Sequence, residues 1–208
     1  MIKKFNYFFQ ALLIYLIFLI GRILGIKISR KLFSYIFFLI GPIFKSKDII
    51  TSNIKIFSKN ISDSESKGII DNMWRNYGMT FIEYIFLDYF RKNNNHMKII
   101  GLNNISEQIE GGKPVIFVSG HFANFELMSM EITKKNINLA TIYRPLNNFF
   151  LNPLMEFLRK KYVCKNQIKK GINGVRESIE FIKKKYSIAL MIDQRVSEGE
   201  KVNFFGKP

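Results

Sequence analysis

Cysteine, histidine and acidic residues are all scarce in this sequence of 208 residues. The single cysteine, Cys164, excludes an intramolecular disulfide and a cysteine-based zinc site, and it gives no reason to expect an oxidising compartment. The two histidines, His96 and His121, lie far apart, and neither belongs to a recognisable ligand pattern. We therefore expect no metal site and no cofactor.

The shortage of acidic residues leaves a strongly basic chain. Lys and Arg number 32 against 16 Asp and Glu, which gives a formal net charge of +16. Such a charge favours anionic partners such as phospholipid headgroups, phosphorylated glycolipids, acidic carrier proteins or nucleic acid. The sequence carries no recognised nucleic-acid-binding motif, so nucleic acid is not an expected partner.

Charge is also missing from a long stretch near the N-terminus, residues 5–21. Extended to Ile26, this stretch is just long enough for a helix that crosses a hydrocarbon core of ~30 Å. No small-x-small cleavage site ends it, which argues against a signal peptide. Four cations follow this stretch, more than the two, Lys3 and Lys4, that precede it. The positive-inside rule therefore predicts that the rest of the chain lies in the cytoplasm. The four are Arg22, Lys27, Arg30 and Lys31.

A second apolar run, residues 32–44, is too short to span a bilayer and is interrupted by Gly41 and Pro42. Two interpretations stay open, an interfacial segment that contacts lipid and a buried helix of the domain. We expect an anchor and interfacial segment over residues 1–44 and one catalytic domain over residues 45–208.

The body of the chain has the pattern of an α/β domain. A polar stretch at 53–66 precedes a helical region at 69–90, which Gly78 is expected to divide. Short apolar runs then alternate with amphipathic helical stretches, which predicts a sheet flanked by helices. The predicted strands are 114–120, 138–143 and 187–193, and the predicted helices are 125–135, 149–161 and 173–185.

The strand predicted at 114–120 leads directly into His121, and Glu126 follows five residues later. On a single helix these two side chains would lie about 140° apart, so they can cooperate only if His121 lies in a turn and Glu126 in the next helix. A carboxylate bonded to one imidazole nitrogen leaves the other available as a general base. The alternative is a histidine that caps or packs at a strand end.

The segment GHFANFEL, residues 120–127, resembles the HxxxxD/E block of the late acyltransferases of lipid A biosynthesis. Three further blocks resemble the same family in the same order. These are NMWRNYGMTFIEY at 72–84, YRPLNN at 143–148 and IALMIDQ at 188–194.

This resemblance implies an N-terminal transmembrane or interfacial helix followed by a glycerolipid-acyltransferase-like mixed sheet flanked by helices. It also implies transfer of a fatty acyl chain from acyl carrier protein to a hydroxyl of a lipid A precursor, an acylated and phosphorylated glucosamine disaccharide. The expected place is the bacterial inner membrane, with the catalytic domain on its cytoplasmic side. The family continues beyond NFFGKP with further strands and helices, so the C-terminal part is expected to be truncated.

On this resemblance His121 removes the proton of the acceptor hydroxyl, and Glu126 orients the imidazole and stabilises its cation. Arg144, placed after the second predicted strand, is expected to bind a phosphate or to stabilise the oxyanion, and its alternative role is an ion pair at a strand end.

Four further residues are expected to support the substrate site. Gly120 allows close approach to the backbone, and Asn124 can hold the turn. Asp193 and Gln194 end the last predicted strand, where they either line the acceptor site or tie down the following loop.

The remaining basic runs suit an acidic partner. Arg159-Lys160-Lys161, Lys169-Lys170 and Lys183-Lys184-Lys185 are candidate docking sites for acyl carrier protein, although such runs are commonly solvated faces. His96, in the polar run RKNNNH, is expected to be solvated.

Two other functions remain open on the sequence. One is acylation of a different glycolipid or of a glycerophospholipid, although glycerophospholipid acyltransferases typically carry Asp in place of Glu126. The other is a non-catalytic basic protein that binds membranes, for which His121 would be dispensable.

Overall fold

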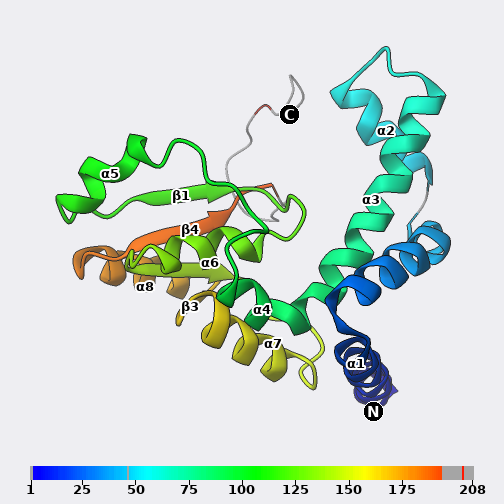
Figure 1. Ribbon diagram of the computed structural model, residues 1–208, viewed down its shortest axis with the longest axis horizontal. Coiled ribbons are helices and arrows are strands. Elements are labelled where there is room, and N and C mark those ends of the chain that lie inside the picture. The colour runs from blue at the N-terminus through cyan, green and yellow to red at the C-terminus, as the bar shows by residue number, and fades with distance from the viewer. Residues whose placement is uncertain (1, 46, 194–202, 204–208) are drawn as a thin grey trace. The chain divides into compact units, whose positions relative to one another are not determined.

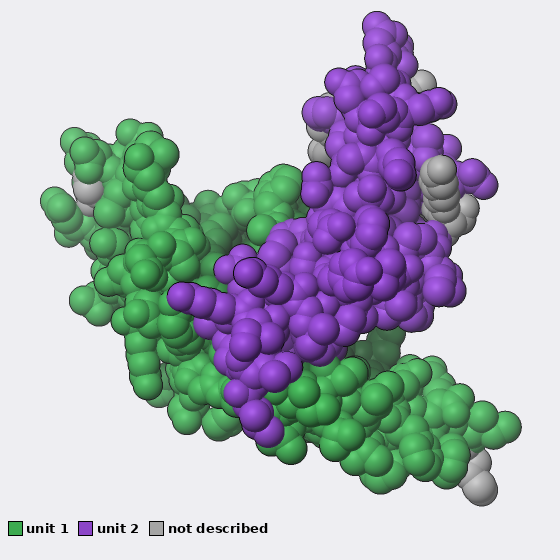
Figure 2. All heavy atoms as spheres, turned by 45° about the vertical axis from the view of Figure 1, so that its right-hand side comes forward, with its two compact units in different colours: residues 1–22, 84–193 green, residues 23–83, 194–208 purple. Residues whose placement is uncertain are grey.

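The computed structural model describes residues 2–45, 47–193 and 203, and the chain forms two compact units (Figure 1, Figure 2). The first unit comprises residues 1–22 and 84–193, and the second comprises residues 23–83 and 194–208. The α/β class is confirmed. The predicted division into an anchor over 1–44 and a catalytic domain over 45–208 stays a prediction.

The N-terminal helix α1, Ile2–Phe44, is interrupted at one residue. Gly25 has φ 75° and ψ 164°, a conformation open to glycine because it lacks a Cβ. Two helical segments therefore meet there. Among the described residues, α1 is the one helix that is long and apolar enough to cross a membrane by length and composition.

The second unit contains the later part of α1 and two more helices, α2 (Lys47–Phe57) and α3 (Asp63–Glu83). The prediction that Gly78 divides the helical region is wrong, because α3 runs through it. A Cβ at Gly78 would overlap the backbone carbonyl oxygen of Phe33, so this glycine allows two helices to approach closely. Phe33 is buried, whereas Ile43 and Phe44 are 81% and 77% exposed, so the 32–44 run is buried on one side only.

The first unit contains a parallel sheet in the order β1-β4-β2-β3 (Figure 1). The four described strands all run parallel, whereas a mixed sheet was expected. The three predicted strands are confirmed with slightly shorter bounds, and the polar strand β3 was not predicted. The bounds are β1 Ile116–Ser119, β2 Leu139–Tyr143, β3 Asn166–Lys169 and β4 Ser187–Met191.

Helices fill the connections between these strands. The chain moves across the sheet from β1 to β2 to β3, and it then returns to place β4 between β1 and β2. Right-handed crossovers put the returning helix α8 on the face opposite to α6 and α7. The bounds are α4 Leu87–Lys92, preceded by the 3-10 helix η1 Tyr84–Phe86, then α5 Asn103–Glu110, α6 Glu126–Lys134, α7 Asn152–Leu158, the π-helical turn η2 Arg159–Val163, and α8 Ile172–Lys183.

The centre of the sheet is closely packed. Ala140, Ile168 and Ile188 come from three different strands and are buried, and Phe181 and Ile182 of α8 pack against them. Burying such side chains stabilises the sheet by roughly 1.5–3 kcal/mol for each large one. A rigid sheet therefore carries the loops that follow the strands, as ligand sites of open α/β folds require.

Candidate active site

The register of the sheet brings His121 and Asp193 together. Ser119 of β1 and Met191 of β4 are register partners in these neighbouring strands. His121 lies two residues beyond Ser119, and Asp193 lies two residues beyond Met191. The backbone N–H of His121 donates to Oδ2 of Asp193 at 2.7 Å, and its ring Nδ1 lies 2.6 Å from Oδ1. One carboxylate therefore holds both the backbone and the ring of the histidine.

The protonation state of this pair follows from its contacts. Burial acts to raise the pKa of Asp193, but the hydrogen bonds from the backbone and ring of His121 outweigh it, and the pKa is lowered. An ionised carboxylate can only accept, so Nδ1 carries the proton in the neutral imidazole. The basic lone pair of the ring is then on Nε2. The two side chains are 30% and 34% exposed, so substrate can reach them.

A tight turn orients the histidine. The Phe122 N–H donates to the Gly120 carbonyl at 2.9 Å, and Ala123 has a positive φ of 45°. The His121 ring packs edge-on against Phe125 with 4.5 Å between centroids. A Cβ at Gly120 would lie 2.8 Å from Phe122 Cε2 and 3.1 Å from Asp193 Oδ2, so a larger side chain here would displace the Phe122 ring and crowd the carboxylate that holds His121.

Asn124 lies at the end of this turn, where its carbonyl accepts from the Leu127 N–H at 3.1 Å as α6 begins. His121 is thus in a turn and Glu126 is in the following helix, as the sequence predicts.

The carboxylate of Glu126 is bonded to different partners from those expected. It was expected to orient His121, but its Oε1 accepts from Arg159 Nε at 2.6 Å and from the Tyr84 hydroxyl at 2.8 Å. Arg159 Nη2 also donates to the Tyr84 oxygen at 3.2 Å. The acid on Nδ1 of His121 is Asp193 instead. Glu126 begins α6, where an anion is favoured by the helix N-terminus.

Burial and close contacts together set the charge states of Arg159 and Tyr84 in this second cluster. Only 9% of the Glu126 side chain and 11% of the Arg159 side chain are exposed. Burial alone would lower the pKa of Arg159, but Glu126 and Tyr84 raise it overall. The pKa of Tyr84 is raised, by burial first and then by Glu126. Arg159 is therefore cationic and Tyr84 a neutral phenol, and Arg159 is not the surface docking residue that its basic run suggested.

Arg144 leaves the carboxyl end of β2 and is exposed. Within the part of the chain that the structure describes, it forms no hydrogen bond or ion pair, so the alternative of an ion pair at the strand end has no support there. Because β4 lies between β1 and β2, the exits to Arg144 and His121 are two strand spacings apart, about 10 Å. Arg144 is thus an exposed cation on the same edge of the sheet as His121.

The segment after Arg144 is fixed by polar side chains. Tyr143 donates from its hydroxyl to Glu156 Oε1 at 2.7 Å, and burial, followed by this carboxylate, raises the pKa of Tyr143 to about 12. The Asn148 side chain donates to the Tyr7 carbonyl at 2.8 Å and accepts from the Phe150 N–H at 3.1 Å. The YRPLNN block therefore connects the sheet edge to the first helix.

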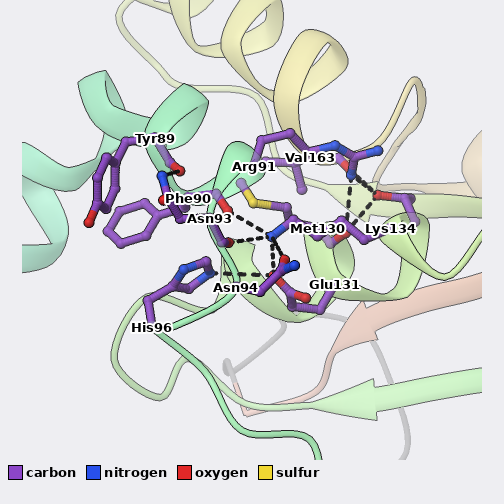
Figure 3. A network of polar contacts seen from close by, with 11 residues as sticks. Tyr89, Phe90, Arg91, Asn93, Asn94, His96, Met130, Glu131, Lys134 and Val163 are labelled. Carbon is purple, nitrogen blue, oxygen red and sulfur yellow. Dashed lines mark hydrogen bonds and ion pairs between the residues drawn. The ribbon is translucent and has the colours of Figure 1, made fainter.

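The prediction that His96 is solvated is wrong. Only 10% of its side chain is exposed, and its ring packs edge-on against Phe90 with 4.9 Å between centroids (Figure 3). The ammonium of Lys134 lies at the centre of the same network and donates to Glu131 Oε1 and to the Phe90 carbonyl, both at 2.7 Å. The pKa of His96 is lowered, by burial first and by Lys134 second, while Glu131 opposes both.

Two remaining expectations concern Gln194 and metal binding. Gln194 lies outside the described residues. Among the residues that are described, no group of three His, Cys, Asp or Glu side chains is placed to hold a metal ion. At the sheet edge, the described residues include the imidazole of His121, the carboxylate of Asp193 and the guanidinium of Arg144.

Comparison with known proteins agrees with the resemblance of the four sequence blocks. No curated protein matches the chain in sequence. The family described as bacterial lipid A biosynthesis acyltransferase matches residues 2–208, and the chain therefore belongs to this family.

Proposed function

We propose that this chain transfers a fatty acyl group from an acyl carrier protein thioester to a hydroxyl of a lipid A precursor, at the cytoplasmic face of the inner membrane. The observation that carries the proposal is the His121–Asp193 pair at the carboxyl edge of the sheet, in a chain of this family. A histidine held at Nδ1 by an ionised carboxylate is suited to general-base catalysis at Nε2.

The proposed reaction proceeds by direct transfer. Nε2 of His121 takes the proton of the acceptor hydroxyl while the oxygen attacks the thioester carbonyl carbon. The tetrahedral intermediate then collapses, the carbon–sulfur bond breaks, and the proton passes from Nε2 to the departing thiolate. Asp193 stabilises the imidazolium that exists between these two proton transfers. The products are the ester and the free carrier thiol.

Glu126 has a positioning role in this proposal. Its bonds to Arg159 and Tyr84 fix the start of α6, and the turn that carries His121 leads directly into that helix. Arg144 supplies an exposed guanidinium on the same edge for a phosphate of the acceptor or for the oxyanion. Gly120 and Asn124 shape the turn that carries His121 from β1 to α6.

The test is transfer of a radiolabelled acyl chain in membranes that contain the protein, from acyl carrier protein to a tetraacylated lipid A precursor. His121→Ala and Asp193→Asn are each expected to lose about 10²–10⁴-fold in rate. Glu180→Gln is the matched control, because Glu180 is an acid that is 58% exposed and pairs only with Lys183 among the described residues. Its rate is expected to equal that of the wild type.

Each alternative predicts a different result. Full activity in His121→Ala would reject the general-base mechanism. Transfer to a glycerophospholipid but not to the lipid A precursor would reject the proposed acceptor, and a preference for acyl-coenzyme A would reject the proposed donor. Membrane binding with no transfer by the wild type to any acceptor would favour the non-catalytic alternative.

A further inference from the structure

The first part of α1 has one face turned toward the sheet unit. Its less exposed residues recur at i, i+4, i+7, i+11 and i+14, the spacing of a single helical stripe. Ala11 and Phe18 are 2% and 6% exposed, and Ala11 packs in a cluster with Leu151, Met155 and Tyr84. The stripe consists of Tyr7, Ala11, Ile14, Phe18 and Gly21.

Polar bonds attach the same part of α1 to the sheet unit along its length. They run from residue 7 to residue 22, which corresponds to about 22 Å of helix. Both ends of this part are therefore fixed to the domain. The bonds are Asn148 Nδ2 to Tyr7 O at 2.8 Å, Tyr15 hydroxyl to Phe150 O at 2.7 Å, Arg22 Nη1 to Ile85 O at 2.8 Å, and the two Arg22–Asp88 bonds at 2.8 and 2.6 Å.

The opposite face of this helix is apolar and uncovered in the structure. Its residues are 49–77% exposed, and together they form a continuous apolar surface of the kind that marks an interaction site. Phe149 and Phe150, which are 48% and 37% exposed, extend the surface through ring contacts with Tyr7 and Phe8. The helical part of the surface consists of Phe5, Phe9, Leu12, Leu13, Leu16, Ile20 and Ile23.

A transmembrane course would conflict with the bonds on the covered face. The part of the helix that is bonded to the sheet unit is about 22 Å long, so in a transmembrane course it would occupy most of a hydrocarbon core of ~30 Å. The Arg22–Asp88 pair and the irregular backbone around Asn148 would then enter the lipid with the helix. Charged side chains cost several kcal/mol at that depth, and irregular backbone is not tolerated against lipid. A course along the membrane surface avoids both costs, because the polar groups stay on the covered side.

We propose that the first part of α1 lies in the plane of one leaflet, with its uncovered face in lipid, and that the N-terminus and the sheet unit lie on the same side of the membrane. The partner of this surface is a bilayer with anionic headgroups, which Lys3 and Lys4 complement at the start of the helix. This proposal does not depend on the proposed acyl transfer.

The first part of α1 is linked to the candidate site through Tyr84. Tyr84 packs in the cluster of Ala11, and its hydroxyl bonds to Glu126. One side chain therefore connects the lipid-bound helix to the cluster at the start of α6.

The first experiment compares the sides on which two residues lie. The lone Cys164 is buried, so Cys164→Ser gives a background for single cysteines. Lys3→Cys reports on the N-terminus, and Glu180→Cys on α8 reports on the sheet unit. A membrane-impermeant maleimide is expected to label both from the same side, in spheroplasts or in inverted vesicles. Labelling of the two from opposite sides would overturn the proposal.

The second experiment measures depth. Three positions on the same side of the helix, seven residues apart, span about 21 Å along it. The variants are Phe9→Cys, Leu16→Cys and Ile23→Cys. With nitroxide labels, in vesicles of phosphatidylethanolamine and phosphatidylglycerol, all three are expected at the same shallow depth. A depth that is greatest at Leu16→Cys and small at both ends would mean a spanning helix. Failure of the chain to bind the vesicles would also overturn the proposal, whatever the outcome of the transfer assay.

Discussion

His121 and Asp193 each lie two residues beyond a pair of register partners, Ser119 and Met191, in the neighbouring parallel strands β1 and β4. Because these strands are parallel and in register, their exits deliver a base and an acid to the same place. The pair therefore depends on the sheet itself, and a rigid sheet is a precise support for a catalytic geometry.

Asp193→Asn tests the role of the acid on Nδ1. The amide removes the charge that stabilises the imidazolium, and it can also donate to Nδ1 and thereby move the proton to Nε2. The expected result is a loss of about 10²–10⁴-fold in kcat with little change in KM for the acyl donor. Because the pKa of Asp193 is lowered, its carboxylate stays ionised at mildly acidic pH and adds no protonation step to the wild-type rate there. A rise in KM at constant kcat would instead indicate a role in binding substrate.

The buried pair of Glu126 and Arg159 predicts a different response. Glu126→Gln leaves the Arg159 cation buried without its counter-charge, which typically costs about 3–5 kcal/mol. The expected result is a clear fall in Tm in detergent. The double variant Glu126→Leu with Arg159→Met removes both charges and is expected to recover most of the Tm.

Activity of that double variant separates two roles of Glu126. A positioning role predicts that much of the activity returns with the Tm. A stable but inactive double variant would mean that Glu126 acts on His121 directly, as the resemblance to the family implied.

The sequence predicted those elements that have a local pattern of apolar residues. It predicted less well the features that depend on contacts between distant segments. The runs around Val118, Ile142 and Ala189 were recognised as strands because each is continuously apolar, as strands of parallel sheets commonly are. Val118 is nevertheless 52% exposed, because β1 is an edge strand of the described sheet. The strand β3 was missed because NQIK is polar, as an edge strand can be. The burial of Arg159 was not predicted, because its neighbours Lys160 and Lys161 made the segment look like an exposed basic surface. The close approach at Gly78 depends on Phe33 of α1, which is distant in the sequence.

The contact between His121 and Asp193 likewise could not be predicted from local sequence patterns. Asp193 was selected as a residue at a strand end, but its bond to His121 depends on which strands are neighbours and in what register. The strand order β1-β4-β2-β3 places the last described strand next to the first, and periodicity along the chain does not encode that order. Glu126 follows His121 by five residues, so spacing in the sequence connected that acid to His121 instead.

Two glycines give a matched test of close packing. At Gly120 an added Cβ meets the ring of Phe122, which is 79% exposed and can move, and it approaches Asp193 Oδ2 at 3.1 Å. Gly120→Ala is therefore expected to lower the transfer rate at least tenfold with a small change in Tm. At Gly78 the added Cβ meets the backbone of Phe33, which cannot move cheaply, so Gly78→Ala is expected to lower the Tm strongly. The reverse pattern would contradict this account of both positions.

His96 predicts how stability changes with pH. Its pKa is lowered in the folded protein from an ordinary value of 6.5, so the unfolded chain binds the proton more readily. The stability that depends on neutral His96 is complete above pH 6.5 and is lost as the pH falls toward the folded pKa. One such group contributes at most about 1.4 kcal/mol for each pH unit.

The measurement is the Tm of the wild type and of His96→Leu between pH 7.5 and 5.5. Leucine keeps the ring of Phe90 covered and removes the titration. The charged groups that face His96 are Glu131 and Lys134 of α6, and both remain in the variant. The Tm of the wild type is therefore expected to fall more steeply toward acid than that of the variant. If the wild type instead gains stability relative to the variant at pH 5.5, the attraction of Glu131 for a protonated His96 outweighs burial and Lys134.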